Sequence, residues 1–180
     1  MEPTSIQTPV AGGLWQGLID FVGAHLHLIE PLVFALGFAE SIVLVSLLVP
    51  STVLFLAIGG LHNAAGGHFV PLWLAGAAGA FLGDVISYAL GRYFRADIAG
   101  IWPFSKKPEW YVMARGFFRS WGAPGIILSK FLGMMRPFVP VVAGAASMRW
   151  LPFLLASAIS CLLWAGAFLG PGHGLGWFMH

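Results

Sequence analysis

The sequence is poor in charged residues. Only 9% of its 180 residues are Asp, Glu, Lys or Arg, whereas soluble domains carry about 25%. Hydrophobic residues make up 58% of the chain, and its 24 glycines fit membrane helices, in which glycine is more frequent than in soluble ones. The shortage of charge argues against a soluble domain and favours an integral membrane protein. A net charge of +2 is too small to indicate a nucleic-acid partner.

Cysteine is almost absent as well. The one cysteine, Cys161, lies in an apolar stretch, and a single thiol excludes any disulfide framework within the chain. We interpret it as a buried, inert side chain. Residues 1–13 lack a basic segment followed by an apolar run, so we expect a flexible N-terminus and no signal peptide.

Residues 14–29 have one apolar face at helical spacing. Asp20, His25 and His27 lie mostly off this face. The pattern predicts an amphipathic helix, either on the membrane surface or packed against the other helices. We interpret its histidines as interfacial side chains rather than metal ligands.

Two stretches, 69–91 and 150–172, suit single membrane crossings. Each has roughly the 20 apolar residues that the ~30 Å hydrocarbon core requires. The first contains one charge, Asp84, with Tyr88 on the same face, and the second contains none. We therefore predict a transmembrane helix in each stretch.

The segment between them, 92–122, concentrates the positive charge. Only Asp97 and Glu109 oppose six of the nine Lys and Arg residues of the chain, and this bias predicts a cytoplasmic loop. The many aromatic residues of the segment indicate a helix lying at the level of the lipid headgroups. The six basic residues are Arg92, Arg95, Lys106, Lys107, Arg115 and Arg119.

The apolar stretch 32–61 is too long for one simple crossing. A continuous helix over it would be about 45 Å long, at about 1.5 Å per residue, against a hydrocarbon core of ~30 Å. Pro50 also removes a backbone donor near its middle. We predict a re-entrant helical hairpin that enters and leaves on one side of the membrane, with its tip near Pro50, Ser51 and Thr52.

A second broken stretch, 125–148, predicts a second hairpin. It is apolar but contains Lys130, Arg136 and Pro140, so it suits neither a simple crossing nor a solvent-exposed loop. Arg149 follows it and places its exit on the cytoplasmic side.

The two hairpins share one order of features. Glu40 lies ten residues before Pro50, and Lys130 lies ten residues before Pro140. A proline-initiated apolar helix follows each, and counting crossings places the hairpins on opposite faces of the membrane. The sequence thus predicts an all-α integral membrane fold: an inverted repeat of two re-entrant hairpins, each followed by a transmembrane helix, plus an N-terminal amphipathic helix. Interrupted segments in corresponding halves point to a transporter's binding site.

The charges within these apolar stretches are the candidate functional groups. Each costs roughly 2.5–3.5 kcal/mol at bilayer depth, so we expect them to face one another or a wet cavity, with Glu40 and Lys130 as partners. The guanidinium of Arg136 suits a phosphate, and Lys130 is either a second ligand or a counter-ion. Glu40 and Asp84 are candidates for proton coupling, with structural ion pairing as the alternative for both.

The tip prolines complete the predicted site. Pro50 and Pro140 shape the hairpin tips, where irregular backbone is tolerated only if protein or water surrounds it. We expect them to contact a substrate through their backbone. The sequence therefore predicts a polar pocket near the middle of the membrane.

Three segments occur in the order FAESIVLVSLLVPSTVLFLAIGGL, GDVISYALGRYF and SKFLGMMRPFVPVVAGAASM. They resemble the DedA family of bacterial inner-membrane proteins, also called the VTT or SNARE-associated-type domain. The resemblance covers roughly residues 30–176, within one membrane domain expected over 14–176. It implies paired re-entrant hairpins and lipid translocation, with recycling of a polyprenyl-phosphate carrier or movement of phospholipid as the activity, dependent in some members on the proton gradient.

The resemblance also assigns residues. It carries the family's membrane-embedded acid over to Glu40 and its basic pair to Lys130 and Arg136, although the first of the pair is often Arg. Many members have a second carboxylate just after the tip proline, where this chain has Thr52. The resemblance therefore implies Glu40 as the main proton site.

The leading hypothesis is a flippase or scramblase for an anionic phospholipid or polyprenyl-phosphate carrier, with proton coupling as an option. Its partners are the bilayer and the phosphate headgroups of its lipids, in a multi-pass protein of the bacterial plasma (inner) membrane. We expect no enzyme activity, no cofactor, no metal and no nucleic acid. A homo-oligomer stays open, because the glycine-rich stretch 76–83 can pack within or between chains.

Three other functions are alternatives to it. The first is a membrane phosphatase, because Lys130 and Arg136-Pro137 resemble part of a lipid-phosphatase motif. Five rather than six residues separate the basic side chains, however, which turns one of them away from its required face. The second is a membrane scaffold or lipid-binding protein that does not transport. The third is a proton-coupled exporter of small cations or drugs, against which the few acidic sites argue.

Overall fold

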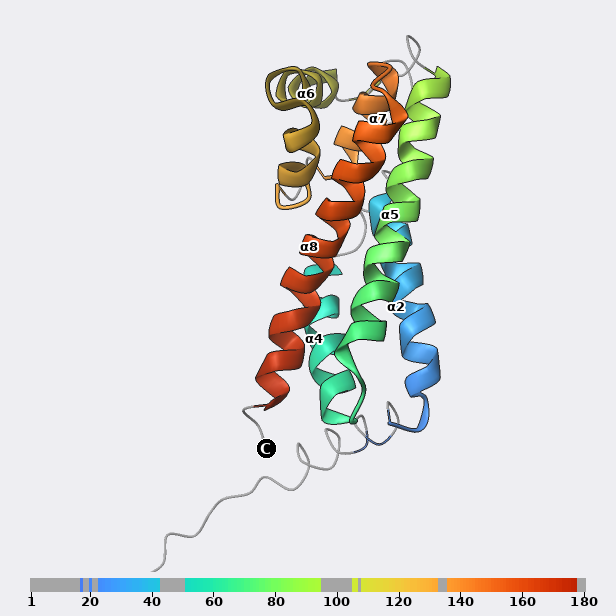
Figure 1. The fold of residues 1–180 in the computed structure, drawn as a ribbon, viewed down its shortest axis with the longest axis vertical. Coiled ribbons are helices and arrows are strands. Elements are labelled where there is room, and N and C mark those ends of the chain that lie inside the picture. Colours follow the sequence, from blue (N-terminus) through green and yellow to red (C-terminus); the bar gives the residue numbers. More distant parts are fainter. Residues whose placement is uncertain are drawn as a thin grey trace, which may run out of the picture.

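The computed structural model describes residues 17, 20, 23–42, 51–94, 105–106, 108–132 and 136–177. Within these residues the regular structure is helical and no strand occurs, in agreement with the predicted all-α class. Two long helices, α5 (Phe69–Phe94) and α8 (Trp150–Trp177), run side by side along the molecule (Figure 1). Both are long and apolar enough to cross a membrane, over Phe69–Phe94 and Trp150–Gly174.

Shorter helices cover the two long ones at opposite ends. In the lower part of Figure 1, α2 (Leu26–Ser41) packs along α5, and α4 (Ser51–Ala64) packs along α8. In the upper part, α7 (Phe138–Ala145) packs against α5, and α6 (Pro108–Ser129) lies against α7 and α8. The long helices therefore form the frame on which every other described helix rests.

The same local signals begin both long helices. Gly66, at a φ of 79°, reverses the chain between α4 and α5, and Ser147, at a φ of 55°, does so between α7 and α8. Each long helix then has a proline in its first turn, Pro71 or Pro152, where the missing N–H has no helical acceptor to lose. In the reversal between α7 and α8, the carbonyl oxygen of Met148 accepts hydrogen bonds from the Tyr88 hydroxyl and the Arg92 guanidinium.

Glycines bring the helices into close contact. A Cβ atom at Gly79 of α5 would overlap the carbonyl oxygen of Phe34 in α2, and one at Gly172 of α8 would overlap that of Leu56 in α4. Small residues allow backbones to approach in this way in membrane helices, where lipid tails supply little hydrophobic driving force for packing. Packing within the chain, one of the two options for the glycine-rich stretch 76–83, is thus observed at Gly79.

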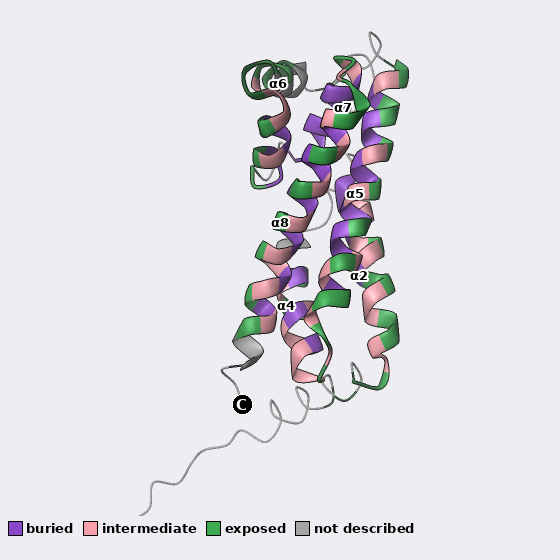
Figure 2. Ribbon diagram, in the orientation of Figure 1, coloured by how far each residue is buried: buried purple, intermediate pink, exposed green. Residues whose placement is uncertain are grey.

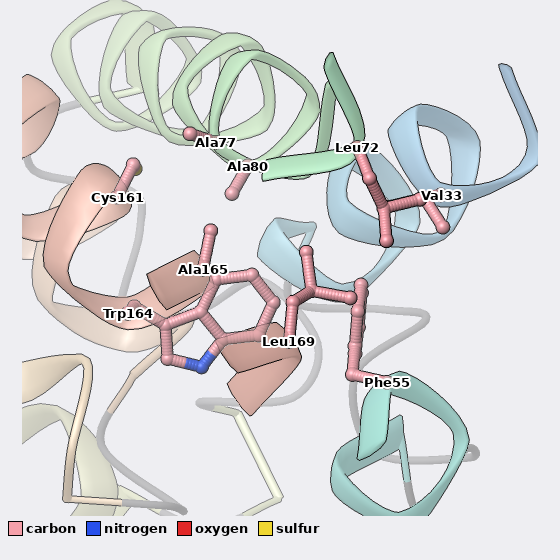
Figure 3. Packing of buried hydrophobic residues seen from close by; sticks show 9 residues of the cluster. All are labelled: Val33, Phe55, Leu72, Ala77, Ala80, Cys161, Trp164, Ala165 and Leu169. Carbon is pink, nitrogen blue, oxygen red and sulfur yellow. The ribbon is translucent and has the colours of Figure 1, made fainter. Parts of the chain in front are cut away.

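Two apolar clusters hold the frame together. The first joins α2, α4, α5 and α8, and Figure 3 shows its side chains pointing to one another between the helices. In it the ring of Phe55 meets that of Trp164 edge-on, with centroids 4.9 Å apart. The second joins α5, α6, α7 and α8 at the other end and comprises Tyr88, Ile126, Val139, Ala143, Phe153 and Ala156.

The outer surface is apolar as well. Figure 2 shows exposed positions along the outward sides of the long helices. On α8 they include Leu151, Leu155, Ile159 and Leu163, which lie four residues apart and are between 49% and 68% exposed. Large apolar side chains in such a row on the surface, with charged ones inside, are expected of a protein that faces lipid.

Three predicted features lie partly or wholly outside the described residues. Of the amphipathic helix predicted at 14–29, residues 14–16, 18–19 and 21–22 lie outside them, and its last residues, from Leu26, form the start of α2. The flexible N-terminus predicted over 1–13 also lies outside the described residues, as does Pro50 of the predicted hairpin tip, whereas Ser51 and Thr52 of that tip begin α4. Within the basic segment 92–122, α6 begins at Pro108, and Gly122 interrupts it with a φ of 53° and a ψ of −131°.

Candidate functional site

The four charged residues predicted at membrane depth are all buried, each at most 8% exposed. Glu40 lies in the last turn of α2, and Asp84 lies within α5. Lys130 follows the end of α6, and Arg136 precedes α7 by two residues. Three parts of the chain, α2, α5 and the connection between α6 and α7, thus bring two acids and two bases into the protein interior.

Lys130 pairs with Asp84. Its Nζ lies 2.8 Å from Oδ1 of Asp84 and also donates to the Ser41 hydroxyl at 3.3 Å. The second oxygen of Asp84, Oδ2, accepts from the Ser157 hydroxyl at 2.7 Å and from the Cys161 thiol at 3.6 Å. Both oxygens of this buried carboxylate therefore have donors, as a buried charge requires.

Arg136 pairs with Glu40 through its Nη1. Its guanidinium also lies over Trp164, with Cζ 3.9 Å from the ring centroid, a distance at which the cation attracts the ring. Nε and Nη2 of Arg136 are buried and find no hydrogen-bond partner among the described residues. A guanidinium has five N–H groups in a planar fork, so this one retains capacity to donate.

The predicted pairing of Glu40 with Lys130 is wrong. The structure joins Glu40 to Arg136 and Lys130 to Asp84 instead. Asp84 is buried within α5 and lies within ion-pair distance of Lys130, and Ser157 donates to its other oxygen. The convergence of the four charges in the protein interior was predicted, whereas their partners were not.

A model of the VTT domain matches residues 49–174, more than half of the chain. The chain belongs to the VTT-domain (DedA) family. No solved structure matches it. The membership agrees with the resemblance found in the sequence.

Relatives of this VTT-domain chain are membrane proteins. It is 34% identical over 141 residues to the Escherichia coli inner membrane protein YabI, covering 78% of this chain and 55% of YabI. It is 32% identical over 155 residues to an uncharacterized membrane protein of Buchnera aphidicola, covering 86% of this chain and 60% of that protein. An uncharacterized membrane protein of Mycobacterium leprae is 30% identical over 170 residues, covering 90% and 72%.

The VTT-domain chain is a membrane protein of the bacterial inner membrane, as its apolar helices and these relatives show. It spans only part of the length of these relatives, 55% of YabI and 60% of the Buchnera protein. Nothing in the names of the relatives states a substrate.

The prolines of the predicted site have different outcomes. Pro140 is buried in the first turn of α7, four residues after Arg136, where its ring fits the start of a helix. Pro50 lies outside the described residues. Contact of either proline with a substrate stays a prediction.

Three contributors to the site were missed in the sequence. Ser41 and Ser157 bond the Lys130–Asp84 pair, and Trp164 supports the guanidinium of Arg136. Ser157 and Trp164 lie in a helix without Asp, Glu, Lys or Arg. The sequence signal that could have found them is their spacing of seven residues, which places both on one face of α8. No group of three or more His, Cys, Asp or Glu suited to a metal occurs within the described residues.

A histidine is buried at the opposite end of the bundle, outside the candidate spanning helices. His62, in the last turn of α4, packs against Gly67, and its ring centroid lies 6.3 Å from that of His173. Burial lowers the pKa of His62, and His173 and His68 lower it further against the opposing effect of Glu30. His62 is therefore neutral at physiological pH and acts as a packing group.

Proposed function

We propose that this chain carries an anionic lipid from one leaflet of the membrane to the other, as a flippase or scramblase. The observation that carries the proposal is the guanidinium of Arg136, which is buried between the long helices and retains N–H groups without a partner among the described residues. A phosphate is the group that such a planar fork binds best. The lipid tail would stay in the bilayer, against the apolar outer surface.

Charge balance supports a role for Glu40 as the proton site. In the structure Glu40 neutralises Arg136, so an incoming phosphate would compete with its carboxylate. Protonation of Glu40 removes that competition and leaves a cation ready for the phosphate. Loss of the proton after the lipid leaves would restore the ion pair and bias the protein back toward its resting state.

Lys130 and Asp84 serve the same site in a different way. Lys130 adds a second buried positive charge, and Asp84 holds it in place through a pair that Ser157 completes. In this proposal Lys130 contacts the phosphate only when Asp84 takes up a proton. Asp84 is thus a second candidate for proton coupling, after Glu40.

The arrangement of the short helices supports two re-entrant hairpins related as an inverted repeat. α2 and α4 cover one end of the long helices, and α7 and the last turns of α6 cover the other (Figure 1). The proposed hairpins, with tips near Pro50 and before Pro140, would enter from opposite leaflets. Irregular backbone at such tips is compatible with the membrane when it lines a protein interior.

The test is transfer of a labelled anionic lipid by the purified protein in phosphatidylcholine vesicles, measured by quenching of the outer leaflet. Arg136→Ala should lower the rate at least about tenfold, because a charge-assisted hydrogen bond contributes about 1.5–3 kcal/mol. Lys106→Ala, at an exposed lysine outside both pairs, should keep the wild-type rate.

A second variant separates transport from folding. Glu40→Gln with Arg136→Met replaces the buried pair by uncharged side chains, so the bundle is not left with an unpaired charge. This variant should keep its melting temperature and lose lipid transfer. Wild-type transfer by a folded Arg136 variant would rule out the assignment.

The same vesicles test the other functions. A lipid-binding scaffold would retain labelled lipid without moving it between leaflets. Both ion pairs are formed in the structure, which is compatible with that alternative. A small-cation or drug exporter would exchange its substrate for protons across the vesicle membrane and would show no lipid transfer. The proposal includes no bond cleavage, so phosphate release from the lipid would contradict it.

A further inference from the structure

The first part of α6, residues 108–121, lies across the bundle at one end. Figure 1 shows it nearly end-on, whereas α5 and α8 stand along the long axis. Gly122, in the left-handed region, turns the chain so that the rest of α6 runs along the bundle toward Lys130. A helix that lies perpendicular to spanning helices at their end is in the plane of the membrane surface.

This crosswise helix has an apolar side. Met113, Phe117 and Trp121 follow one another at four-residue spacing. Phe117 is half-buried against the cluster of α5, α7 and α8, and its ring stacks on that of Trp121 at 6.3 Å. Met113 and Trp121 remain 51% and 53% exposed. The apolar side is thus anchored by Phe117 and continues beyond the bundle.

The opposite side is basic. Arg115 and Arg119, again four residues apart, are both exposed and lie about half a turn from Phe117 on the helix. Glu109 is the only acid in the crosswise helix. A helix with exposed tryptophan on one side and arginines on the other suits the boundary between acyl chains and headgroups.

We propose that residues 108–121 form a docking surface for the headgroups of anionic phospholipids in the leaflet on the basic side of the protein. Met113 and Trp121 enter the acyl region beside the bundle, and Arg115 and Arg119 extend to the lipid phosphates. Charge complementarity favours anionic over zwitterionic lipid, because the two guanidinium groups attract a net negative headgroup and phosphatidylcholine has no net charge. This surface is separate from the buried pair at Arg136, and its existence does not depend on transport.

The test compares lipids bound to the full chain in nanodiscs of phosphatidylcholine containing a minor fraction of phosphatidylglycerol, read by mass spectrometry after release. Arg115→Gln with Arg119→Gln should reduce the enrichment of phosphatidylglycerol at least about threefold. Arg115→Lys with Arg119→Lys retains both charges and should keep most of the enrichment. Raised salt should weaken the wild-type preference. Equal enrichment in all three proteins would overturn the proposal.

Depth measurements give an independent readout. The native thiol is buried, so spin labels at Val112→Cys, on the basic side, and Met113→Cys, on the apolar side, report single positions. The label at 113 should lie among acyl chains and the label at 112 among headgroups. Both labels in water would contradict the proposal even if lipid transfer at Arg136 were intact, so failure of this surface is distinct from failure of the transport site.

Discussion

At the scale of single residues, the two buried ion pairs differ in how fully they are bonded. Asp84 has donors on both oxygens, and Lys130 donates to two partners. Arg136 has an ion pair and an aromatic contact but retains Nε and Nη2 without partners among the described residues. We therefore assign the Lys130–Asp84 pair mainly to stability and Arg136 mainly to binding.

Asp84→Asn tests this division. The change leaves the Lys130 ammonium buried without a counter-ion, and breaking a buried pair in this way costs about 3–5 kcal/mol. Thermal unfolding in detergent should show a large drop in melting temperature. Adding Lys130→Met removes the uncompensated charge and should recover most of the loss. An Asp84→Asn protein as stable as the wild type would show that the pair does not stabilise the fold.

At the scale of elements, the short helices are positioned by contacts between backbones. α2 approaches α5 so closely at Gly79 that no side chain fits between them. The same holds for α8 and α4 at Gly172. Because α2 carries Glu40, this packing also positions the acid that pairs with Arg136.

Gly79→Ala should therefore destabilise the protein. The added methyl group meets the Phe34 carbonyl, and overpacking of this kind typically costs about 1–3 kcal/mol. Gly116→Ala is the matched control, because it makes the same change in a helix at a position with no neighbour within 4 Å. The melting temperature should fall for Gly79→Ala only. Helix propensity alone would raise the stability of both variants, because Ala is a better helix former than Gly. A melting temperature of Gly79→Ala at or above that of the wild type would contradict the packing argument.

At the scale of the whole molecule, the two chain reversals before the long helices lie at opposite ends. The turn at His68 precedes α5 at the lower end in Figure 1, and the turn at Ala146 precedes α8 at the upper end. The helix α6 of the basic segment lies at the upper end, and the charge bias predicts that this end faces the cytoplasm. The proposed inverted repeat requires the membrane to lie between these turns.

Cysteine labelling of cells tests that arrangement. His68 and Ala146 are exposed, and the one native thiol is buried. A membrane-impermeant thiol reagent should modify His68→Cys in intact cells, whereas Ala146→Cys should react only after the membrane is opened. Reaction of both from the same side would contradict the inverted arrangement.

Much of the frame was predictable because its signals are local. The long helices follow from uninterrupted apolar sequence with a proline in the first turn, and the buried charges follow from the cost of leaving Asp84 or Arg136 in lipid. The partner choice was not predictable, because it depends on how the turn between α6 and α7 orients Lys130. The kink in α6 was equally hidden, since a glycine such as Gly122 is compatible with either a continued helix or a break.

Ser41 gives the two ion pairs a common hinge. Its hydroxyl accepts from Lys130, its carbonyl accepts from Ser87 of α5 at 3.0 Å, and its peptide bond joins it directly to Glu40. A rotation of the last turn of α2 that separates Glu40 from Arg136 must also stretch the bond to Lys130. The two ion pairs are therefore mechanically coupled through Ser41. Release of Arg136 from Glu40 also changes the hydrogen bonding of Lys130.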